Sequence, residues 1–279
     1  MLLIFSGCSG VGKNTVINEL LSQNENLTLL PTYTTRGKRE GEREGFPYHY
    51  LTTEAFQQKI EDREFYEYEQ IHQNFYGTSR RLVADARESG RNLLKDIDVK
   101  GAMNLKRLLK DDLKVVTLFM FVDSPDVLVQ RLTERGETEI ELRLKRYDLE
   151  MEMLPKYEFA VNNDVLPDTV ETVRRLIVFQ TEGKGELTLK VPFSQISEER
   201  IAKLTEELRD KEYAKPISVK AGRTIFYPET AEDAMRYAAA RRAGVNITCL
   251  LTLAPDAIDE ESFDAEDDAA YQRLCVSQK

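Results

Sequence analysis

The sequence predicts an α/β fold in which helices flank a mainly parallel sheet, with a small α/β unit added at the C-terminal end. Short apolar runs recur along the chain and are typical of strands that are buried on both faces. Charged stretches lie between these runs and place apolar residues three and four positions apart, as amphipathic helices do. Strands that alternate with helices in this way favour a parallel sheet.

The first 180 residues alternate between the two patterns. Strands are expected at residues 2–5, 92–94, 115–122 and 159–161, because each of these is a continuous apolar run. Helices are expected at residues 16–21, 83–88, 125–135 and 139–152, where charges alternate with apolar residues at helical spacing.

The pattern restarts after the turn-rich segment TEGKGE, so we predict two domains, at residues 1–183 and 184–279. We call residues 184–279 the extension. Strands are expected in it at 187–193 and 246–253, a strand or hairpin at 217–227, and helices at 197–213 and 231–243. Acidic residues crowd the segment after Pro255, which predicts a mobile tail. The extension has no glycine-rich loop, metal-ligand cluster or histidine, so we expect packing, homo-oligomerisation or regulation rather than catalysis.

Composition limits the function. A net charge of -10 argues against binding to nucleic acid, which needs a basic face. The N-terminal apolar run, of about six residues, is too short for a signal peptide or a membrane span, and no other run approaches roughly 18. Three widely spaced cysteines form neither a disulfide framework nor a zinc motif, which favours a reducing compartment. We therefore expect a cytoplasmic protein that contacts neither nucleic acid nor membranes.

The strand expected at the N-terminus runs directly into the pattern Gly7-x-x-x-x-Gly12-Lys13. Glycines let successive backbone N–H groups turn toward phosphate oxygens, and the N-terminus of a following helix adds its dipole. A lysine at the end of such a loop reaches the outer phosphates of a nucleotide. Because a buried strand precedes the loop and a helical pattern follows, a phosphate-binding loop is favoured over a turn with a solvated lysine.

Asn14 follows the lysine, where such loops carry a Ser or Thr that holds Mg²⁺. An amide oxygen can still ligate Mg²⁺ or a water bound to it, and Thr15 is available for contact with phosphate. We expect Mg²⁺ as the cofactor, with Asn14 and Asp98 as candidate ligands.

A second cluster combines arginines with hydroxyl and aromatic side chains in the segment TYTTRGKREGEREGFPYHY. Arg36 and Arg39 lie three residues apart, and two guanidinium groups suit a doubly charged phosphate because each can bind it bidentately. Taken alone, this segment is equally compatible with a solvated charged loop.

The order of the motifs resembles that of the guanylate kinases, P-loop enzymes that phosphorylate GMP from ATP. After the glycine loop the chain has Thr34-Thr35-Arg36, Arg39, Gly41-Glu42, Gly45, Tyr48, Phe65-Tyr66-Glu67, Tyr76-Gly77-Thr78, Asp96-Ile97-Asp98, Arg131-Leu132-Thr133-Glu134-Arg135-Gly136 and Arg146. The resemblance covers residues 1–180 and implies a P-loop kinase fold, with ATP and GMP as the small-molecule partners.

The resemblance also implies roles for individual residues. ATP binding is expected of Gly7, Ser9, Gly10, Val11, Gly12, Lys13, Asn14, Thr15 and Asn162. GMP binding is expected of Thr32, Arg36, Arg39, Glu42, Tyr48, Glu67, Tyr76, Thr78 and Asp96. Catalysis is expected of Lys13 and of the lid arginines Arg131, Arg135 and Arg146, without a general base.

The chemistry of these residues agrees with a guanine base. Glu67 can accept from both N1–H and N2–H of guanine, and Thr78 can donate to O6. Sites built on such paired polar groups discriminate by about 10⁴-fold. We therefore expect in-line phosphorylation of GMP, and of dGMP. The alternatives are a weakly active interaction module of the same family, which intact Gly7, Gly12 and Lys13 disfavour, and a kinase for another nucleoside monophosphate.

Overall fold

The structure is a computed structural model that describes residues 1–39, 41–71, 73–134, 136, 140–182, 186–223, 225–254 and 265–276. The chain forms two compact units. Unit 1 comprises Met1–Ser6 and Lys13–Thr117, and unit 2 comprises Gly7–Gly12 and Leu118–Lys279.

Unit 1 contains three parallel strands with β8 (Asn92–Asp96) in the middle, between β1 (Leu2–Gly7) and β2 (Leu27–Leu29). Every residue of β1 is buried, as its continuous apolar run predicts. The helices of this unit are α1 (Lys13–Gln23), α2 (Thr53–Glu61), α3 (Arg80–Glu88) and α4 (Val99–Leu109). The strands expected at 2–5 and 92–94 and the helices expected at 16–21 and 83–88 are confirmed, and each is longer than expected.

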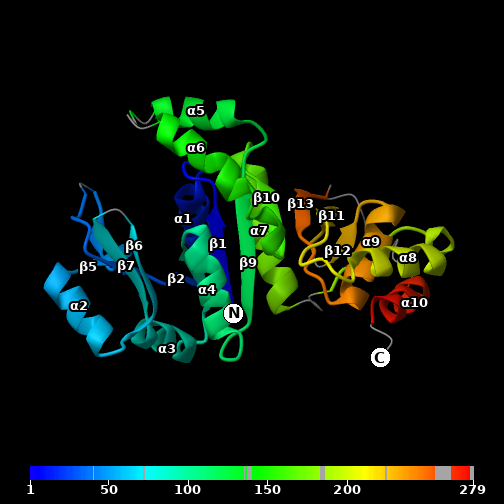
Figure 1. The fold of residues 1–279 in the computed structure, drawn as a ribbon, viewed down its shortest axis with the longest axis horizontal. Coiled ribbons are helices and arrows are strands. Elements are labelled where there is room, and N and C mark those ends of the chain that lie inside the picture. The colour runs from blue at the N-terminus through cyan, green and yellow to red at the C-terminus, as the bar shows by residue number, and fades with distance from the viewer. Residues whose placement is uncertain are drawn as a thin grey trace. The chain divides into compact units, whose positions relative to one another are not determined.

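A second sheet of unit 1 was not expected from the sequence. Its strand order is β4 (Arg43–Glu44), β5 (Pro47–Tyr50), β3 (Thr32–Thr34), β7 (Asn74–Ser79) and β6 (Phe65–Ile71). The β6–β7 hairpin packs against α2, where Phe56 stacks on Phe65 and Phe75 with ring centroids 4.6 and 5.4 Å apart (Figure 1). This sheet carries most of the residues expected to bind GMP.

Unit 2 contains a sheet in the order β9 (Val115–Phe121), β10 (Phe159–Asn162), β13 (Cys249–Leu253), β11 (Ile217–Ala221) and β12 (Phe226–Pro228). All neighbours are parallel except β11 and β12. The helices α5 (Pro125–Glu134) and α6 (Ile140–Met151) follow β9, and α7 (Leu166–Thr181) follows β10 (Figure 1). Because β13 pairs with β10, the extension continues the sheet of the preceding residues.

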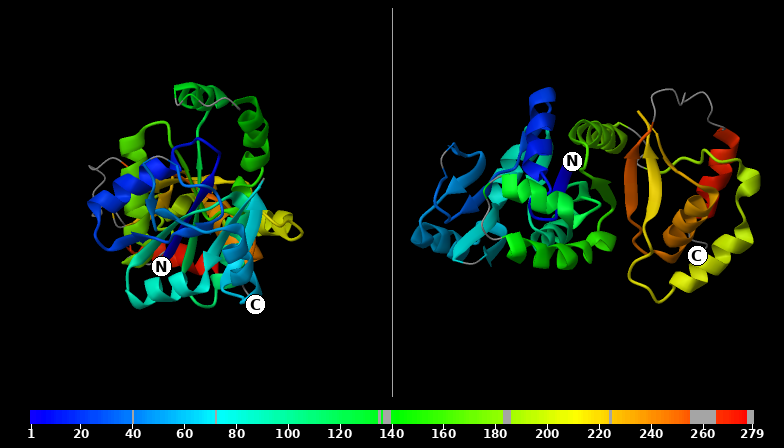
Figure 2. Two further views of the ribbon diagram at one scale, coloured as in Figure 1. Left: turned by 90° about the vertical axis from the view of Figure 1, so that its left-hand side faces the viewer. Right: turned by 90° about the horizontal axis from the view of Figure 1, so that it is seen from above.

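The extension builds its own core from three helices, α8 (Glu198–Leu208), α9 (Ala231–Ala243) and α10 (Ala265–Cys275) (Figure 2). Of these, α9 packs beside β11 and β12, and α8 and α10 pack against α9. Its buried members are Leu189, Ile201, Ala234, Met235, Ala238, Ala239, Tyr271 and Cys275. The alanines of α9 allow the neighbouring helices to approach closely, and the Tyr271 hydroxyl donates to the carbonyl of Ala234 at 2.7 Å. The α/β fold class, with a mainly parallel sheet and added C-terminal elements, is confirmed.

Three expectations for the extension need correction. Residues 187–193 do not form a strand: the Leu189 N–H donates to Asp268 rather than to a neighbouring strand, and Pro192 has no N–H to offer. The helix expected at 197–213 ends at Leu208. The segment expected to be a mobile tail includes α10, whose Tyr271 is fully buried, while residues 255–264 and 277–279 lie outside the described residues.

Two further expectations for the extension are settled. Residues 217–227, expected as one strand or a hairpin, form the β11–β12 hairpin. The helix at 231–243 is confirmed as α9. The division at residue 183 concerns independent folding and stays a prediction. Within the described ranges, no helix combines the length and apolar character that crossing a membrane requires.

Candidate active site

The glycine loop of the sequence connects the end of β1 to the start of α1 at Lys13. Gly7, Gly10 and Gly12 have φ angles of 123°, 86° and 98°, a region that L-residues with side chains rarely adopt. At Gly7 a side chain is excluded outright, because a Cβ would lie 2.0 Å from the carbonyl oxygen of Met120. Lys13, at the start of α1, is partly exposed, and Asn14 and Thr15 are exposed.

One donor of the loop already faces an anion. The backbone N–H of Ser9 donates to the Glu150 carboxylate of α6, with 3.0 Å between N and Oε2. A carboxylate at this position is what a loop of inward-turned N–H groups attracts. Glu150 could not be identified from the sequence, because no local pattern pairs it with a loop 141 residues away.

Two side chains brace the loop within unit 2. Asn163 donates from Nδ2 to the carbonyl of Val11 at 2.7 Å, and its side chain is buried. Arg131 donates from Nη1 to the same carbonyl at 3.2 Å and from Nη2 to the carbonyl of Asn163 at 2.8 Å. The expected lid residue Arg131 therefore contacts the backbone of the loop. Sequence reasoning missed Asn163, the second asparagine of the run NND.

The other residues expected around ATP are placed as follows. Asn162 ends β10, and its side chain bonds Asp164 through Nδ2 to Oδ2 at 2.9 Å. Arg146 lies on the exposed side of α6. Arg135 lies outside the described residues. The hydroxyl of Tyr147 donates to the carbonyl of Val122 at 3.0 Å and so fixes α6 against the end of β9.

In unit 1 the arginine cluster is ordered by Glu42. Its carboxylate accepts from Arg36 Nη2 at 2.7 Å, from the Tyr50 hydroxyl at 2.6 Å and from the backbone N–H of Arg39 at 2.7 Å. Burial acts to raise the pKa of Glu42, but these hydrogen bonds, led by Arg36, outweigh it and lower the pKa to about 2. Glu42 is therefore a permanent anion that fixes Arg36, while the Arg39 side chain stays exposed.

Tyr48 lies beside this arginine and packs against a second tyrosine. The guanidinium carbon of Arg36 is 5.0 Å from the ring centroid of Tyr48, and Tyr48 meets Tyr76 edge to face at 6.2 Å. Burial, followed by the negative charge of Asp96, raises the pKa of Tyr48 to about 12. The Tyr48 hydroxyl thus keeps its proton at neutral pH and can donate it.

Glu67 and Thr78 face each other across the β6–β7 hairpin. The Thr78 hydroxyl donates to Glu67 Oε1 at 2.5 Å, and Thr78 is fully buried. Burial raises the pKa of Glu67, and the hydrogen bond from Thr78 and the charge of Lys95 oppose that rise. The structure thus brings together two residues that the sequence analysis expected to bind the base, and their role in binding stays a prediction.

Lys95 is a further charged residue in this part of unit 1, and it was not singled out from the sequence. It lies in β8 and is fully buried, and its Nζ donates to Thr32 Oγ1 at 2.6 Å. The signal was present as a lysine within the otherwise apolar run NLLKD. Asp96 follows it; burial raises the pKa of Asp96, while the charges of Lys13 and Lys95 oppose that rise.

Two of the expected site residues offer oxygen atoms that suit Mg²⁺. Asn14 offers an amide oxygen in the first turn of α1, and Asp98 offers a carboxylate at the N-terminus of α4. Asp98 Oδ1 already accepts from the N–H groups of Lys100 and Gly101, at 2.8 and 3.0 Å. Within the described ranges, no group of three His, Cys, Asp or Glu side chains is placed to hold an ion. This donor set fits Mg²⁺ held chiefly by nucleotide phosphates and water.

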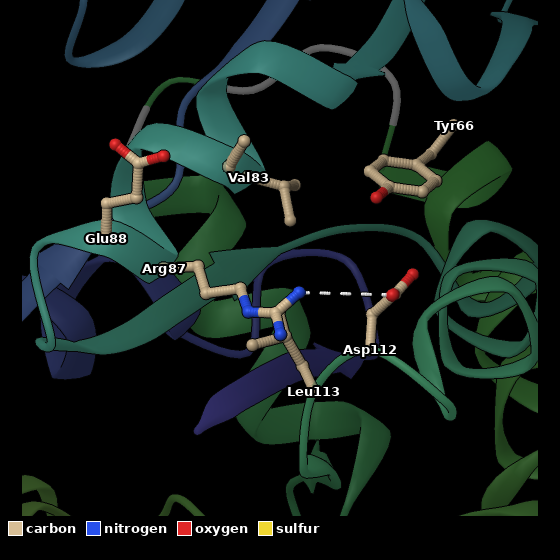
Figure 3. Close-up of a pocket in the computed structure, with 7 residues that line it drawn as sticks. Tyr66, Val83, Arg87, Glu88, Asp112 and Leu113 are labelled. Atoms are coloured by element: carbon tan, nitrogen blue, oxygen red, sulfur yellow. Dashed lines mark ion pairs between the residues drawn. The ribbon is translucent and has the colours of Figure 1, made fainter.

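A hollow of about 360 Å³ elsewhere in unit 1 does not belong to this site (Figure 3). It is lined by Tyr66, Val83, Ala84, Arg87, Glu88, Asp112 and Leu113, none of which is an expected site residue. The ion pair drawn across it joins Arg87 Nη1 to Asp112 Oδ1 at 3.9 Å between two well-exposed side chains. Such exposed pairs contribute little binding or stability.

Comparison with known proteins supports the motif assignment. The family model for guanylate kinase matches residues 1–180. A guanylate kinase of Chlorobaculum tepidum is 40% identical over 175 residues, covering 62% of this chain and 89% of the relative. One of Campylobacter jejuni is 34% identical over 191 residues, covering 66% and 92%. The crystal structure of guanylate kinase from Anaplasma phagocytophilum superposes with a TM-score of 0.52 at 26% identity, covering 66% of this chain and 86% of that one. The chain belongs to the guanylate kinase family of nucleotide kinases.

Proposed function

We propose that this chain transfers the γ-phosphoryl group of ATP to GMP, and to dGMP, by in-line displacement with Mg²⁺. Membership of the family supports the reaction class. The single observation that carries the choice of acceptor is the pair formed by Glu67 and the buried Thr78, 2.5 Å apart between Oε1 and Oγ1. A carboxylate beside a hydroxyl complements the donor and acceptor edge of guanine.

On binding, guanine N1–H and N2–H donate to the Glu67 carboxylate. A hydroxyl carries one proton, so Thr78 turns from Glu67 to donate to guanine O6. Adenine presents a lone pair at N1, where guanine presents N1–H, so the Glu67 carboxylate would face another acceptor. The Thr78 hydroxyl would face the donor at the 6-amino group instead of the acceptor O6. Buried polar groups left unpaired in this way are the basis of strong discrimination, on the order of 10⁴-fold.

The phosphate of GMP is held by Arg36, Arg39, Tyr48 and Tyr76, with Thr32 as a further donor. Glu42 accepts a hydrogen bond from one nitrogen of Arg36, and the ring of Tyr48 lies beside the Arg36 guanidinium. The second pKa of a phosphate monoester is about 6, so the attacking oxygen is ionised at pH 7 and no general base is required. The residues of this group therefore act by positioning an anion in line with its target.

The triphosphate of ATP is held by the glycine loop and by Lys13. The N–H groups of the loop and the positive charges of Lys13, Arg131, Arg135 and Arg146 offset the charge that spreads over the transferring group. Asn162, at the end of β10, is the residue we propose to contact the ATP base. Arg131 has a second role, since its contacts with the Val11 and Asn163 carbonyls set the shape of the loop.

Mg²⁺ bound with ATP supplies charge neutralisation at the phosphates, and Asn14, together with Asp98 through water, is the protein contribution we propose to its coordination. Asp98 Oδ1 is used by the N-terminus of α4, so only Oδ2 is left for that contact. The exposed position of Asn14 and Thr15 in the first turn of α1 leaves both accessible to the nucleotide.

The substitution Glu67→Gln tests the choice of base. It keeps the size of the side chain but replaces one acceptor with a donor that faces the donors of guanine. We expect the ratio of kcat/KM for GMP to that for AMP to fall by at least about 100-fold, within the range of such discrimination. Glu61→Gln, which makes the same change at an exposed position of α2, should leave the ratio unchanged. An unchanged ratio in Glu67→Gln would mean that Glu67 does not read the base.

A further inference from the structure

Lys95 is a charged side chain enclosed in unit 1 that no part of the proposed reaction uses. It stands in β8, between β1 and β2, and none of its surface is exposed. A lysine is almost never fully buried unless its charge is compensated. Its position in the strand places its ammonium at the start of β3, where the residues expected to bind GMP begin.

All three N–H bonds of this ammonium find acceptors. Nζ lies 3.3 Å from the carbonyl oxygen of Leu30, 3.1 Å from that of Pro31 and 2.6 Å from Thr32 Oγ1. A neutral amine has two N–H bonds and would leave one of these acceptors unpaired. The geometry therefore fits the charged form.

The shortest of these bonds fixes the direction of a hydroxyl. Thr32 Oγ1 accepts from Lys95, so the single proton of Thr32 points away from Lys95 and is left for another acceptor. In the proposed function that acceptor is an oxygen of the GMP phosphate. Thr32 is half-buried and can reach such a ligand.

The same charge acts on the carboxylates of the base site. The positive charge of Lys95 opposes the effect of burial on both Glu67 and Asp96, and so favours their ionised forms. An ionised Glu67 is the form that can accept two hydrogen bonds from guanine.

We propose that Lys95 is a positioning residue for the acceptor nucleotide, because its ammonium turns the Thr32 hydroxyl toward the phosphate. This inference rests on the proposed function and adds to it a residue that contacts no substrate atom. It also predicts how GMP affinity depends on pH.

Burial lowers the pKa of Lys95 from its usual 10.5 to about 8, against the opposing charges of Glu67 and Asp96. The other ionisable groups around these two carboxylates are Glu69 on β6, Asp98 and Lys100 at the start of α4, Lys13 on α1 and Tyr48 on β5. Since the protonated form is the one that orients Thr32, the contribution of Lys95 to GMP binding is complete well below pH 8 and is lost as the pH rises through about 8.

The test measures the Kd for GMP by calorimetry in the full chain, from pH 6.5 to 9, for the wild type and for Lys95→Met. Methionine matches the length of lysine without its charge. At pH 7 we expect Lys95→Met to raise the Kd by about ten- to a hundredfold, the scale of hydrogen bonds made by a charged group. The ratio of the two Kd values should then decline between pH 7 and 9. Titration of the ligand is common to both proteins and cancels in that ratio.

Two controls separate positioning from damage to the fold. Lys110→Met makes the same change at the exposed end of α4 and should bind GMP as the wild type does at every pH. The Kd for ATP should be the same in all three proteins, because Lys95 donates hydrogen bonds to Leu30, Pro31 and Thr32, none of which is proposed to bind ATP.

A second pair of variants does not depend on the folding of Lys95→Met. Thr32→Ser keeps the hydroxyl and should bind GMP like the wild type, whereas Thr32→Val should weaken binding about as much as Lys95→Met, and the double variant should be no weaker than either. Equal GMP binding by Lys95→Met and Lys110→Met, a Kd ratio that does not change with pH, or wild-type binding by Thr32→Val would overturn the role of Lys95 alone. A wild type that binds no GMP would overturn the proposed function as well.

Discussion

The Glu150 carboxylate accepts a hydrogen bond from the backbone N–H of Ser9, at 3.0 Å between the two heavy atoms. Ser9 lies in the glycine loop, and Glu150 lies near the end of α6, the helix that also carries Arg146. The loop donor that a phosphate oxygen would use is thus held by an anion of the protein itself. In the proposed function, ATP binding displaces this carboxylate, which then stands near a highly charged ligand.

We therefore predict that Glu150→Gln binds ATP more tightly than the wild type. Glutamine keeps an oxygen that can accept from Ser9 but removes the repulsion between the carboxylate and the triphosphate. The Kd for a non-hydrolysable ATP analogue should fall about three- to tenfold, which corresponds to roughly 1 kcal/mol. Glu152→Gln, two residues on and exposed, is the control. Weaker binding in Glu150→Gln would show that the carboxylate helps to hold the nucleotide rather than displacing it.

A second prediction concerns two neighbouring arginines of α7 that share one carboxylate. Arg175 is 4% exposed and donates to Glu171 Oε1 at 2.8 Å and to the carbonyls of Ala221 and Ala254 at 3.0 and 3.1 Å. Arg174 also pairs with Glu171, at 2.6 Å, but is 47% exposed. Arg175→Met should lower the free energy of unfolding by about 2–4 kcal/mol, because it leaves buried acceptors unpaired. Arg174→Met should cost less than about 1 kcal/mol.

Urea unfolding of the two variants at several pH values checks this. Hydrogen bonds from Arg174 and Arg175 lower the pKa of Glu171 from 4.5 to about 2. The stabilisation by the pairs with Glu171 is therefore present above about pH 4.5 and is lost as the pH falls toward 2. In that range Arg174→Met should approach the wild type, whereas Arg175→Met should keep the part of its loss that comes from the carbonyls of Ala221 and Ala254. Equal losses at neutral pH would contradict the idea that Arg175 fastens α7 to the ends of β11 and β13.

A third prediction is that residues 1–183 fold and phosphorylate GMP without the extension, at lower stability. The deletion removes β13 from the edge of β10, removes the carbonyls that Arg175 uses, and exposes Phe179, whose ring stacks on Phe226 with centroids 4.3 Å apart. Thermal unfolding, molecular mass and kinase rate of the fragment are measured beside the full chain. A soluble, monodisperse fragment without activity would show that the extension contributes to the active site, and an unfolded one would show that it belongs to the same folding unit.

The sequence predicted the strands that form continuous apolar runs and missed the strands of the second sheet of unit 1. β1, β8 and β9 are continuous apolar runs, so their pattern identifies them. β3 and β5 read TYT and PYHY, and their side chains are mostly half-buried, so no apolar run marks them. Their assignment depends on tertiary pairing, in which β3 lies between β5 and β7.

The sequence motifs predicted candidate residues for the active site. Residues that lie outside these motifs were not predicted. Lys95, Glu150 and Asn163 act on partners 63, 141 and 152 residues away, and no local pattern links such pairs. In the sequence, the three residues are visible only as a lysine within an apolar strand, an acidic residue on a helix and the second of two adjacent asparagines. Their contacts with the glycine loop and with β3 depend on the tertiary arrangement of the strands and helices, which the sequence does not show directly.

The measurement that tests the proposed phosphorylation of GMP most directly is a steady-state survey of phosphoryl acceptors with the full chain, ATP and Mg²⁺. GMP, dGMP, AMP, CMP and UMP are compared by separating the nucleoside diphosphates formed. We predict turnover of GMP at about 1–100 s⁻¹, as in other kinases, and kcat/KM values for AMP, CMP and UMP that are lower by about 10⁴-fold. Lys13→Ala should lower kcat for GMP by at least about 100-fold, while Lys110→Ala should not. GMP turnover below about 1% of that range, or no preference for GMP over AMP, would contradict the account.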